Sequence, residues 1–279
     1  MDVNLISNAV VNFKQELFDA IKNAQYNGTI YENGHAAKEA LIRSQSLIMN
    51  IHEAAKKSIY DKLDKSVWNV HPPLGNNSPE LKVYGHLKGK NQDIVFVNKE
   101  FSPSKIEIGL ESGKIDPIGI EATEKSIIIG VRSQMSSVDK NFDTLMERAF
   151  AETLNMRLRA KSIVMGEVYL LPLVELDDKV MKLNQIKFKE RKVSIEKFVK
   201  IFNSFTHRES TDMEHQYKFD ASALLIVDFQ SPNPKVIMNG ADLSTYGFED
   251  DVCAMFSNMA PQGFSDRLIG SYNKIHSIS

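Results

Sequence analysis

Residues 126–131 (SIIIGV) and 140–159 (KNFDTLMERAFAETLNMRLR) decide the fold prediction. The first segment is an apolar, largely β-branched run bounded by polar residues, which is typical of a strand buried on both faces of a sheet. The second predicts an amphipathic helix of about five turns that packs on this sheet. Its apolar stripe recurs at three- and four-residue spacing and consists of Phe142, Leu145, Met146, Ala149, Phe150 and Leu154.

Further strand and helix patterns lie on the C-terminal side of this pair. Residues 163–176 (IVMGEVYLLPLVEL) and 221–229 (ASALLIVDF) are long apolar runs, and we expect both to be strands. The segment 179–205 between them reads as mostly helical. A strand, a helix and further strands in succession predict an α/β architecture.

A hairpin is expected on the N-terminal side. Residues 81–87 and 92–97 have short β-type patterns, and residues 88–91 (KGKN) between them supply the glycine and asparagine of a tight reversal. Residues 98–125 are rich in Gly, Pro and Ser without a clear period, which indicates a long insertion with one short strand at 105–110.

The first seventy residues are expected to form two long helices. Apolar residues recur at helical spacing from Val10 to Ile21 and again from Ala37 to Leu63, and Asn27-Gly28 separates the two stretches. The segment 71–77 (HPPLGNN) ends the second helix. We therefore predict one α/β domain over residues 1–279, a mixed central β-sheet flanked by helices, with residues 1–70 as a helical N-terminal subregion.

Composition narrows the possible environments. The 34 Lys and Arg against 36 Asp and Glu exclude a generally basic nucleic-acid coat protein, although a nearly neutral total charge can hide a local basic face. The single cysteine, Cys253, can form neither an internal disulfide nor a cysteine-rich zinc site. The N-terminus lacks a signal-peptide pattern, and the longest apolar runs fall far short of the ~20 residues of a membrane span. We expect a cytoplasmic protein outside the membrane.

The first candidate site residues follow the hairpin and the central strand. Asp93 opens the second hairpin strand, where its carboxylate either binds a divalent cation through oxygen or caps the turn. Strand alternation places Gly130, Arg132 and Gln134 on one face. Arg132 then either holds a phosphate or pairs with a helix carboxylate.

Acidic and basic groups on the expected helices supply further candidates. Glu147 and Glu152 flank the apolar stripe of residues 140–159, so that either could complete a metal-binding pair with Asp93 or form a solvated ion pair. Residues 179–200 carry eight basic residues against two acidic ones, a pattern that suits a phosphate backbone or a solvated helix face. The candidate DNA-binding residues are Lys88, Lys90, Lys187, Lys189, Arg191 and Lys192.

His86, Lys88 and Asp93 match HxKxxxxD, the half-motif of the phospholipase D superfamily, whose histidine attacks phosphorus. The Gly-Ser and Asn that follow in that motif are missing here, since the chain continues IVFVNKEFSPS after Asp93. A zinc-binding Cys/His frame, a Walker A loop and a GxGxxG sequence are also missing from the sequence.

The order of elements resembles the PD-(D/E)XK nuclease superfamily: a helical N-terminus, an acidic residue on a hairpin strand, a central strand ending in a polar cluster, an amphipathic helix and another strand. More specifically, KGKNQDIVFV, GVRSQMSSVDKNFDTLMERAFAETLNMRLR and IVMGEVYLLPLVELD are similar to sequences of type II restriction endonucleases. The resemblance covers residues 81–178.

This resemblance implies Mg²⁺-dependent hydrolysis of phosphodiester bonds in double-stranded DNA by a homodimer. The superfamily's first acidic residue corresponds to Asp93. Its acidic-x-lysine motif corresponds to Gly130-Val131-Arg132, where this chain has no carboxylate and has arginine in place of lysine. Superfamily members with a relocated second carboxylate suggest Glu147, with Glu152 in reserve, and others with a glutamine near the lysine position suggest Gln134.

We therefore hypothesise that Asp93 and Glu147 bind Mg²⁺, that water attacks phosphorus in line, and that Arg132 and Gln134 orient this water or stabilise the pentavalent phosphate. Two alternatives remain open: a DNA-binding protein that has lost catalysis, and a metal-independent nuclease that uses His86. The apolar stripe of residues 37–63 suits either a dimer interface or an internal core.

Overall fold

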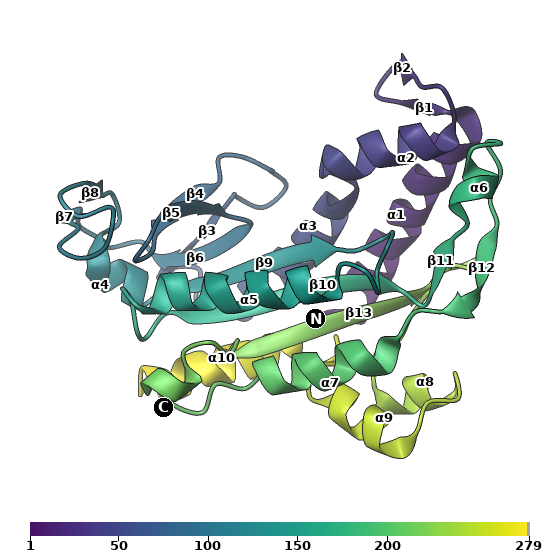
Figure 1. Cartoon of the computed structure of the whole chain (residues 1–279). Helices are drawn as coiled ribbons and strands as arrows, with labels where there is room; N and C mark the ends of the chain where they lie inside the picture. Colours follow the sequence, from purple (N-terminus) through teal and green to yellow (C-terminus); the bar gives the residue numbers. More distant parts are fainter. Residues whose placement is uncertain (278–279) are drawn as a thin grey trace.

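A mixed six-stranded sheet lies at the centre of the computed structural model, which describes residues 1–277 (Figure 1). The strand order is β14-β13-β10-β9-β6-β3. The inner strands β9, β10 and β13 are parallel, whereas the outer strands pair antiparallel. The predicted central strand is thus confirmed as β9. The strands are β3 (Trp68–His71), β6 (Ile94–Asn98), β9 (Ile127–Ser133), β10 (Val164–Pro172), β13 (Ala221–Asp228) and β14 (Lys235–Val236).

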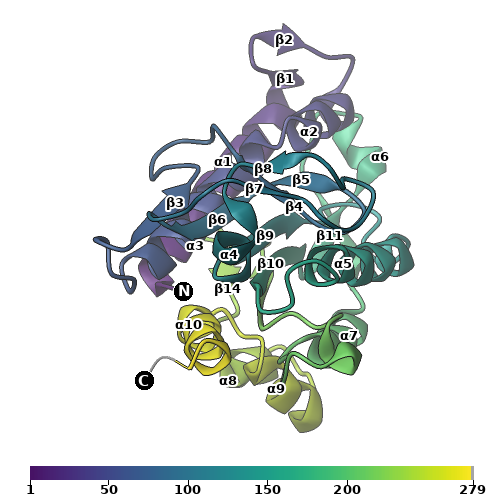
Figure 2. The same ribbon diagram turned by 90° about the vertical axis from the view of Figure 1, so that its left-hand side faces the viewer.

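Helices cover both faces of this sheet, as Figure 2 shows. Side chains at alternate positions of β9 enter different cores, so that Ile127, Ile129 and Val131 pack with the helices α1, α3 and α10. Ile128 faces α5 on the opposite side, and α7 and α9 lie on that side as well. The predicted α/β class with a mixed sheet and flanking helices is therefore confirmed. The helices are α1 (Val3–Asn23), α3 (Met49–Tyr60), α5 (Phe142–Arg157), α7 (Ile195–Phe205), α8 (Gly240–Ser244), α9 (Asp250–Ser257) and α10 (Phe264–Ile275).

The N-terminal region differs from the expectation of two long helices. After α1, Asn27 and Gly28 adopt positive φ angles of 49° and 77° and form the turn of a small hairpin, β1 (Gln25–Tyr26) and β2 (Thr29–Ile30). The predicted second helix is divided into α2 (Gly34–Arg43), a 3₁₀ turn η1 (Ser46–Ile48) and α3. The break falls at Gln45, whose φ of 61° cannot belong to a right-handed helix.

The predicted hairpin has its turn three residues earlier than expected. Strands β4 (Leu81–Tyr84) and β5 (Gly89–Gln92) pair with each other, so that residues 85–88 form the reversal. The α5 side chain of Asn155 stabilises this turn, because it accepts a hydrogen bond from Leu87 N at 2.8 Å and donates one to Lys88 O at 3.1 Å. Strand β6 belongs to the central sheet, and Asp93 lies at the junction between the two sheets.

Two other expectations were wrong in detail. The single strand expected at 105–110 is replaced by two short strands, β7 and β8, which are followed by α4. The segment 179–205 is not mostly helical: β12 occupies its centre and pairs with β11, which forms after Leu173 interrupts the strand begun by β10. These elements are β7 (Ser104–Lys105), β8 (Ile115–Asp116), α4 (Gly119–Glu124), β11 (Val174–Leu176), α6 (Asp178–Met181), β12 (Phe188–Lys192) and the 3₁₀ turn η2 (Met213–His215).

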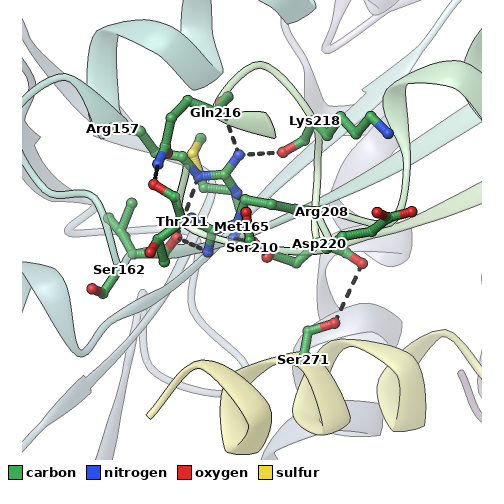
Figure 3. Close-up of polar contacts among 12 residues, drawn as sticks. Arg157, Ser162, Met165, Arg208, Ser210, Thr211, Gln216, Lys218, Asp220 and Ser271 are labelled. Carbon is green, nitrogen blue, oxygen red and sulfur yellow. Dashed lines mark hydrogen bonds and ion pairs between the residues drawn. The ribbon is translucent and has the colours of Figure 1, made fainter. Parts of the chain in front are cut away.

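Buried ion pairs anchor the C-terminal end of α5 to the sheet (Figure 3). Asp220 accepts hydrogen bonds from Arg157 Nη2 at 2.6 Å, from Arg208 Nε at 2.8 Å and from Met165 N at 2.6 Å. The side chains of Arg157, Arg208 and Asp220 are completely buried. Because the carboxylate of Asp220 binds groups from α5, from β10 and from the segment after α7, it holds α5 at a fixed position along β10.

No helix within residues 1–277 combines the length and the apolar character that crossing a membrane requires.

Candidate active site

A cleft of about 520 Å³ opens where β9 ends, between α5 on one side and η1 with the start of α3 on the other. Residues from seven helical and strand elements line it together with loop residues, and Asp93, Arg132 and Gln134 are among them. The end of β9 lines the cleft. Asp93 lies beside this end, because the pairing of β6 with β9 stops at Ile94. Polar side chains from strands far apart in the sequence therefore meet at one position of the sheet edge.

Two carboxylates flank Gly130 across three neighbouring strands. The pairing of Ile94 with Ile129 brings Asp93 beside Gly130, and Gly130 is itself paired with Glu167 of β10. A Cβ atom at position 130 would overlap Oε2 of Glu167. The glycine thus makes room for the neighbouring carboxylate, and the acidic group missing from β9 is present on the adjacent strand.

Arg132 and Lys90 contact the acidic groups of this row and of α5. Arg132 Nη1 lies 3.2 Å from Oε1 of Glu167, and Arg132 Nη2 forms an ion pair with Glu152. Lys90 Nζ pairs with the other oxygen of Glu152. Asp93 Oδ2 accepts a hydrogen bond from Val131 N at 2.8 Å. We call Asp93, Glu152, Glu167, Lys90 and Arg132 the charged cluster.

The carboxylates of the charged cluster have different electrostatic environments. Burial raises the pKa of Glu167 to about 7, and the neighbouring Arg132 offsets this effect only in part. Burial also acts to raise the pKa of Glu152, but Arg132 and Lys90 prevail and the pKa lies below its ordinary value. Glu167 raises the pKa of Arg132, with Glu152 and Asp93 adding to the effect, so the arginine stays charged.

Several buried polar atoms in and beside the cluster have no hydrogen-bond partner among the described residues. They are Oε1 of Glu167, Nη1 of Arg132 and Nε2 of His52, a cleft residue from α3. The ion pair between Arg132 and Glu167 is close but does not have hydrogen-bond geometry. Buried polar atoms are nearly always satisfied in proteins, so this arrangement indicates a position for water, an ion or a ligand.

The structure gathers some predicted site residues and leaves others apart. Asp93, Arg132 and Gln134 all line the cleft, and Gln134 Nε2 donates a hydrogen bond to Ser136 O. Glu147, the predicted second metal ligand, is exposed and lies on another side of α5, so that Glu152 faces the cluster instead. The prediction for Glu147 was therefore wrong about its position.

The predicted DNA-binding residues lie in two places. Lys90 joins the charged cluster, and Lys88 is exposed at the β4–β5 turn. The others belong to β12 or, in the case of Lys187, directly precede it, rather than forming the expected basic helix. Lys187 and Arg191 are exposed there. Lys189 Nζ pairs with Glu175 at 2.8 Å and Lys192 Nζ donates to Tyr246 O at 2.7 Å.

The phospholipase-D-like arrangement is not formed. His86 lies in the β4–β5 turn, where its backbone N donates to Asn155 O, whereas Asp93 follows the opposite end of β5. Strand β5 separates the two side chains, so they do not share a site.

Sequence reasoning missed Glu167. Its signal was present: an ionisable residue in the middle of an apolar run that predicts a completely buried strand. All nine residues of β10 are buried, and Glu167 is only 2% exposed. An ionisable group at such a position without full pairing is a frequent property of functional sites.

The charged cluster does not amount to a preformed metal cage. Within residues 1–277, no three His, Cys, Asp or Glu side chains are arranged so as to hold a metal ion. Mg²⁺ in nucleotide-processing sites is commonly held by one or two carboxylates together with water and substrate phosphates. The oxygen donors of Asp93 and Glu167 fit this pattern.

Comparisons of the chain with protein-family models, with curated proteins and with solved structures found no match.

Proposed function

We propose that this chain is a type II restriction endonuclease that uses Mg²⁺ to hydrolyse phosphodiester bonds at a specific sequence in double-stranded DNA. The row formed by Asp93, Gly130 and Glu167, of which Asp93 lines the cleft, carries this proposal. Support also comes from the order of elements, because an acidic residue before β6, a polar cluster after β9, the helix α5 and the parallel strand β10 match the order of the PD-(D/E)XK superfamily.

Asp93 and Glu167 are the residues that would hold the metal. Both present carboxylate oxygens, which Mg²⁺ prefers, and Oε1 of Glu167 has no hydrogen-bond partner among the described residues. Glu167 thus takes the role expected of Glu147. Mg²⁺ bound there would act as a Lewis acid that stabilises negative charge on the phosphate oxygens.

Arg132 is suited to bind and orient the scissile phosphate. Its guanidinium fork matches the geometry of phosphate oxygens, and its side chain is 23% exposed on the cleft side. It cannot serve as a general base, because an arginine side chain does not lose its proton in proteins. Gln134 also lines the cleft, two residues after Arg132, and its side-chain amide would form a hydrogen bond with the substrate.

Exposed basic residues lie in two segments of the surface. Lys88 lies on the β4–β5 turn, Lys187 lies directly before β12, and Arg191 lies on β12. We propose that they contact the DNA backbone, which would give binding a steep salt dependence. A homodimer would present two such clefts to the two strands of a symmetric site.

A DNA-binding protein without catalysis is the second candidate. The ion pairs of Arg132 and Lys90 with Glu152, and of Arg132 with Glu167, favour it, because they neutralise carboxylates that a metal needs. The two candidates differ in whether a divalent metal leads to cleavage.

The test is incubation of the purified protein with unmethylated phage DNA in Mg²⁺ or in EDTA, followed by gel electrophoresis. Discrete fragments that require Mg²⁺ and disappear in Asp93→Asn and Glu167→Gln would support the proposal. Glu147→Gln is the matched control, because it removes a carboxylate from α5 outside the cleft and should leave cleavage intact. Intact DNA in both conditions, together with a retarded protein–DNA complex in a binding gel, would favour the DNA-binding protein without catalysis. Fragments in EDTA would favour the metal-independent nuclease that uses His86.

A further inference from the structure

The charged cluster holds a cation of its own. We propose that the Arg132 guanidinium takes the place of the divalent metal in the free protein, and that a DNA phosphodiester must draw it away before the metal binds tightly. Metal and phosphodiester would then bind cooperatively. This inference rests on the proposed function and concerns the regulation of the same site.

The position of Arg132 is the first observation. Its two terminal nitrogens reach carboxylates from different elements, Glu152 on α5 and Glu167 on β10. The charge of Asp93, on the other side of Gly130, acts on it as well. A side-chain cation among three carboxylates is where a metal ion would otherwise be attracted.

Charge balance is the second observation. The charged cluster holds three carboxylates and two basic groups, so a divalent ion added with Arg132 in place would leave an excess positive charge in a largely buried site. With Arg132 withdrawn, the metal and Lys90 together would balance the three carboxylates. Uncompensated charge is costly away from water, so metal binding favours withdrawal of Arg132.

Incomplete hydrogen bonding of Arg132 is the third observation. Nη1 of Arg132 has no hydrogen-bond partner among residues 1–277, although it lies beside Glu167. A phosphodiester in the cleft would offer the fork two oxygen acceptors in a favourable geometry. Because binding linkage is reciprocal, a phosphodiester that withdraws Arg132 strengthens metal binding, and the metal strengthens phosphodiester binding by the same factor.

The experiment measures metal binding rather than cleavage, by calorimetric titration of Mn²⁺ into the whole protein at about pH 8.5, where ordinary carboxyl groups are ionised. Arg132→Gln should bind Mn²⁺ about 10-fold or more tightly than the unmodified protein, within the usual range of coupling between sites. Lys90→Gln is the matched control, because Lys90 contacts Glu152 but not Glu167, and it should change the affinity less.

A second titration uses the unmodified protein and does not depend on the folding of a variant. Dimethyl phosphate, a minimal phosphodiester, should strengthen Mn²⁺ binding to the unmodified protein by a larger factor than it does for Arg132→Gln, in which only direct contact between phosphate and metal remains. Equal Mn²⁺ affinity in the unmodified protein and Arg132→Gln would overturn the inference while leaving the metal site intact. An equal gain in Mn²⁺ affinity in Lys90→Gln would also overturn the inference, because the gain would then be a general effect of removing positive charge. Absence of Mn²⁺ binding from every protein would overturn both the inference and the proposed metal site.

Discussion

The substitution Glu167→Gln should stabilise the fold at neutral and alkaline pH while removing a proposed metal ligand. Glu167 is 2% exposed, and burial raises its pKa to about 7 from the ordinary value of 4.5. Glutamine has nearly the same shape and no charge, so it resembles the protonated glutamic acid that the buried position favours.

The magnitude follows from proton linkage. A raised pKa in the folded protein means that the unfolded chain loses the proton first, so the stability contributed by the protonated group is complete below pH 4.5 and is lost as the pH rises to about 7. One pKa unit corresponds to about 1.4 kcal/mol, so the full loss is about 3 kcal/mol. Glu167→Gln should escape this loss.

Urea unfolding of both proteins at pH 5 and at pH 8 measures the effect. The free energy of unfolding of Glu167→Gln, relative to the unmodified protein, should increase by between about 2 and 3 kcal/mol from the lower to the higher pH. The exposed Glu147→Gln should show no such pH-dependent gain. A stability difference that is the same at both pH values would refute the argument, because it would show that Glu167 is ionised without penalty in the folded protein.

Three further substitutions test the surrounding structure. Gly130→Ala should displace the carboxylate of Glu167, lowering the free energy of unfolding by about 1–3 kcal/mol and weakening Mn²⁺ binding in calorimetry. Asp220→Ala should cost about 3–5 kcal/mol in urea unfolding, because it leaves buried arginine side chains without their counter-charge. Asn155→Ala should increase amide hydrogen exchange in residues 85–88, because the turn loses its side-chain hydrogen bonds to α5.

Matched controls separate these effects from general perturbation. Gly270→Ala places a methyl group in open space within α10 and should not reduce stability. Asp212→Ala removes an exposed carboxylate and should cost far less than Asp220→Ala. Unchanged exchange at 85–88 in Asn155→Ala would contradict the role assigned to that side chain.

Elements with a long, regular pattern were predicted well. The apolar run of β9 and the stripe of α5 were each sufficient, since a strand buried on both faces and an amphipathic helix have distinct periodicities. The second half of 179–205 formed α7 for the same reason. The helix prediction for the first half was wrong, because residues 187–192 have no periodicity that distinguishes a short exposed strand from a helix. Pairing with β11 makes this segment a strand.

Turn positions were predicted less well where another element supplies the hydrogen bonds. The Gly and Asn of 88–91 suit a reversal, but the side chain of Asn155 satisfies the backbone at 87 and 88 and moves the turn toward the N-terminus. The break between α2 and α3 at Gln45 could not be predicted, because no glycine or proline lies near it in the sequence.

The sequence by itself determined the α/β class, the central strand and the helix after it, because these depend on local periodicity. It also indicated Asp93, Arg132 and Gln134 as candidate site residues, but the pairing of β6 with β9 is what brings them to one cleft. Only the tertiary structure decided that Glu167, rather than Glu147, joins them. That choice depends on the register between β9 and β10 and on the rotation of α5 over the sheet. Both are set by packing among segments distant in the chain, which no local pattern records.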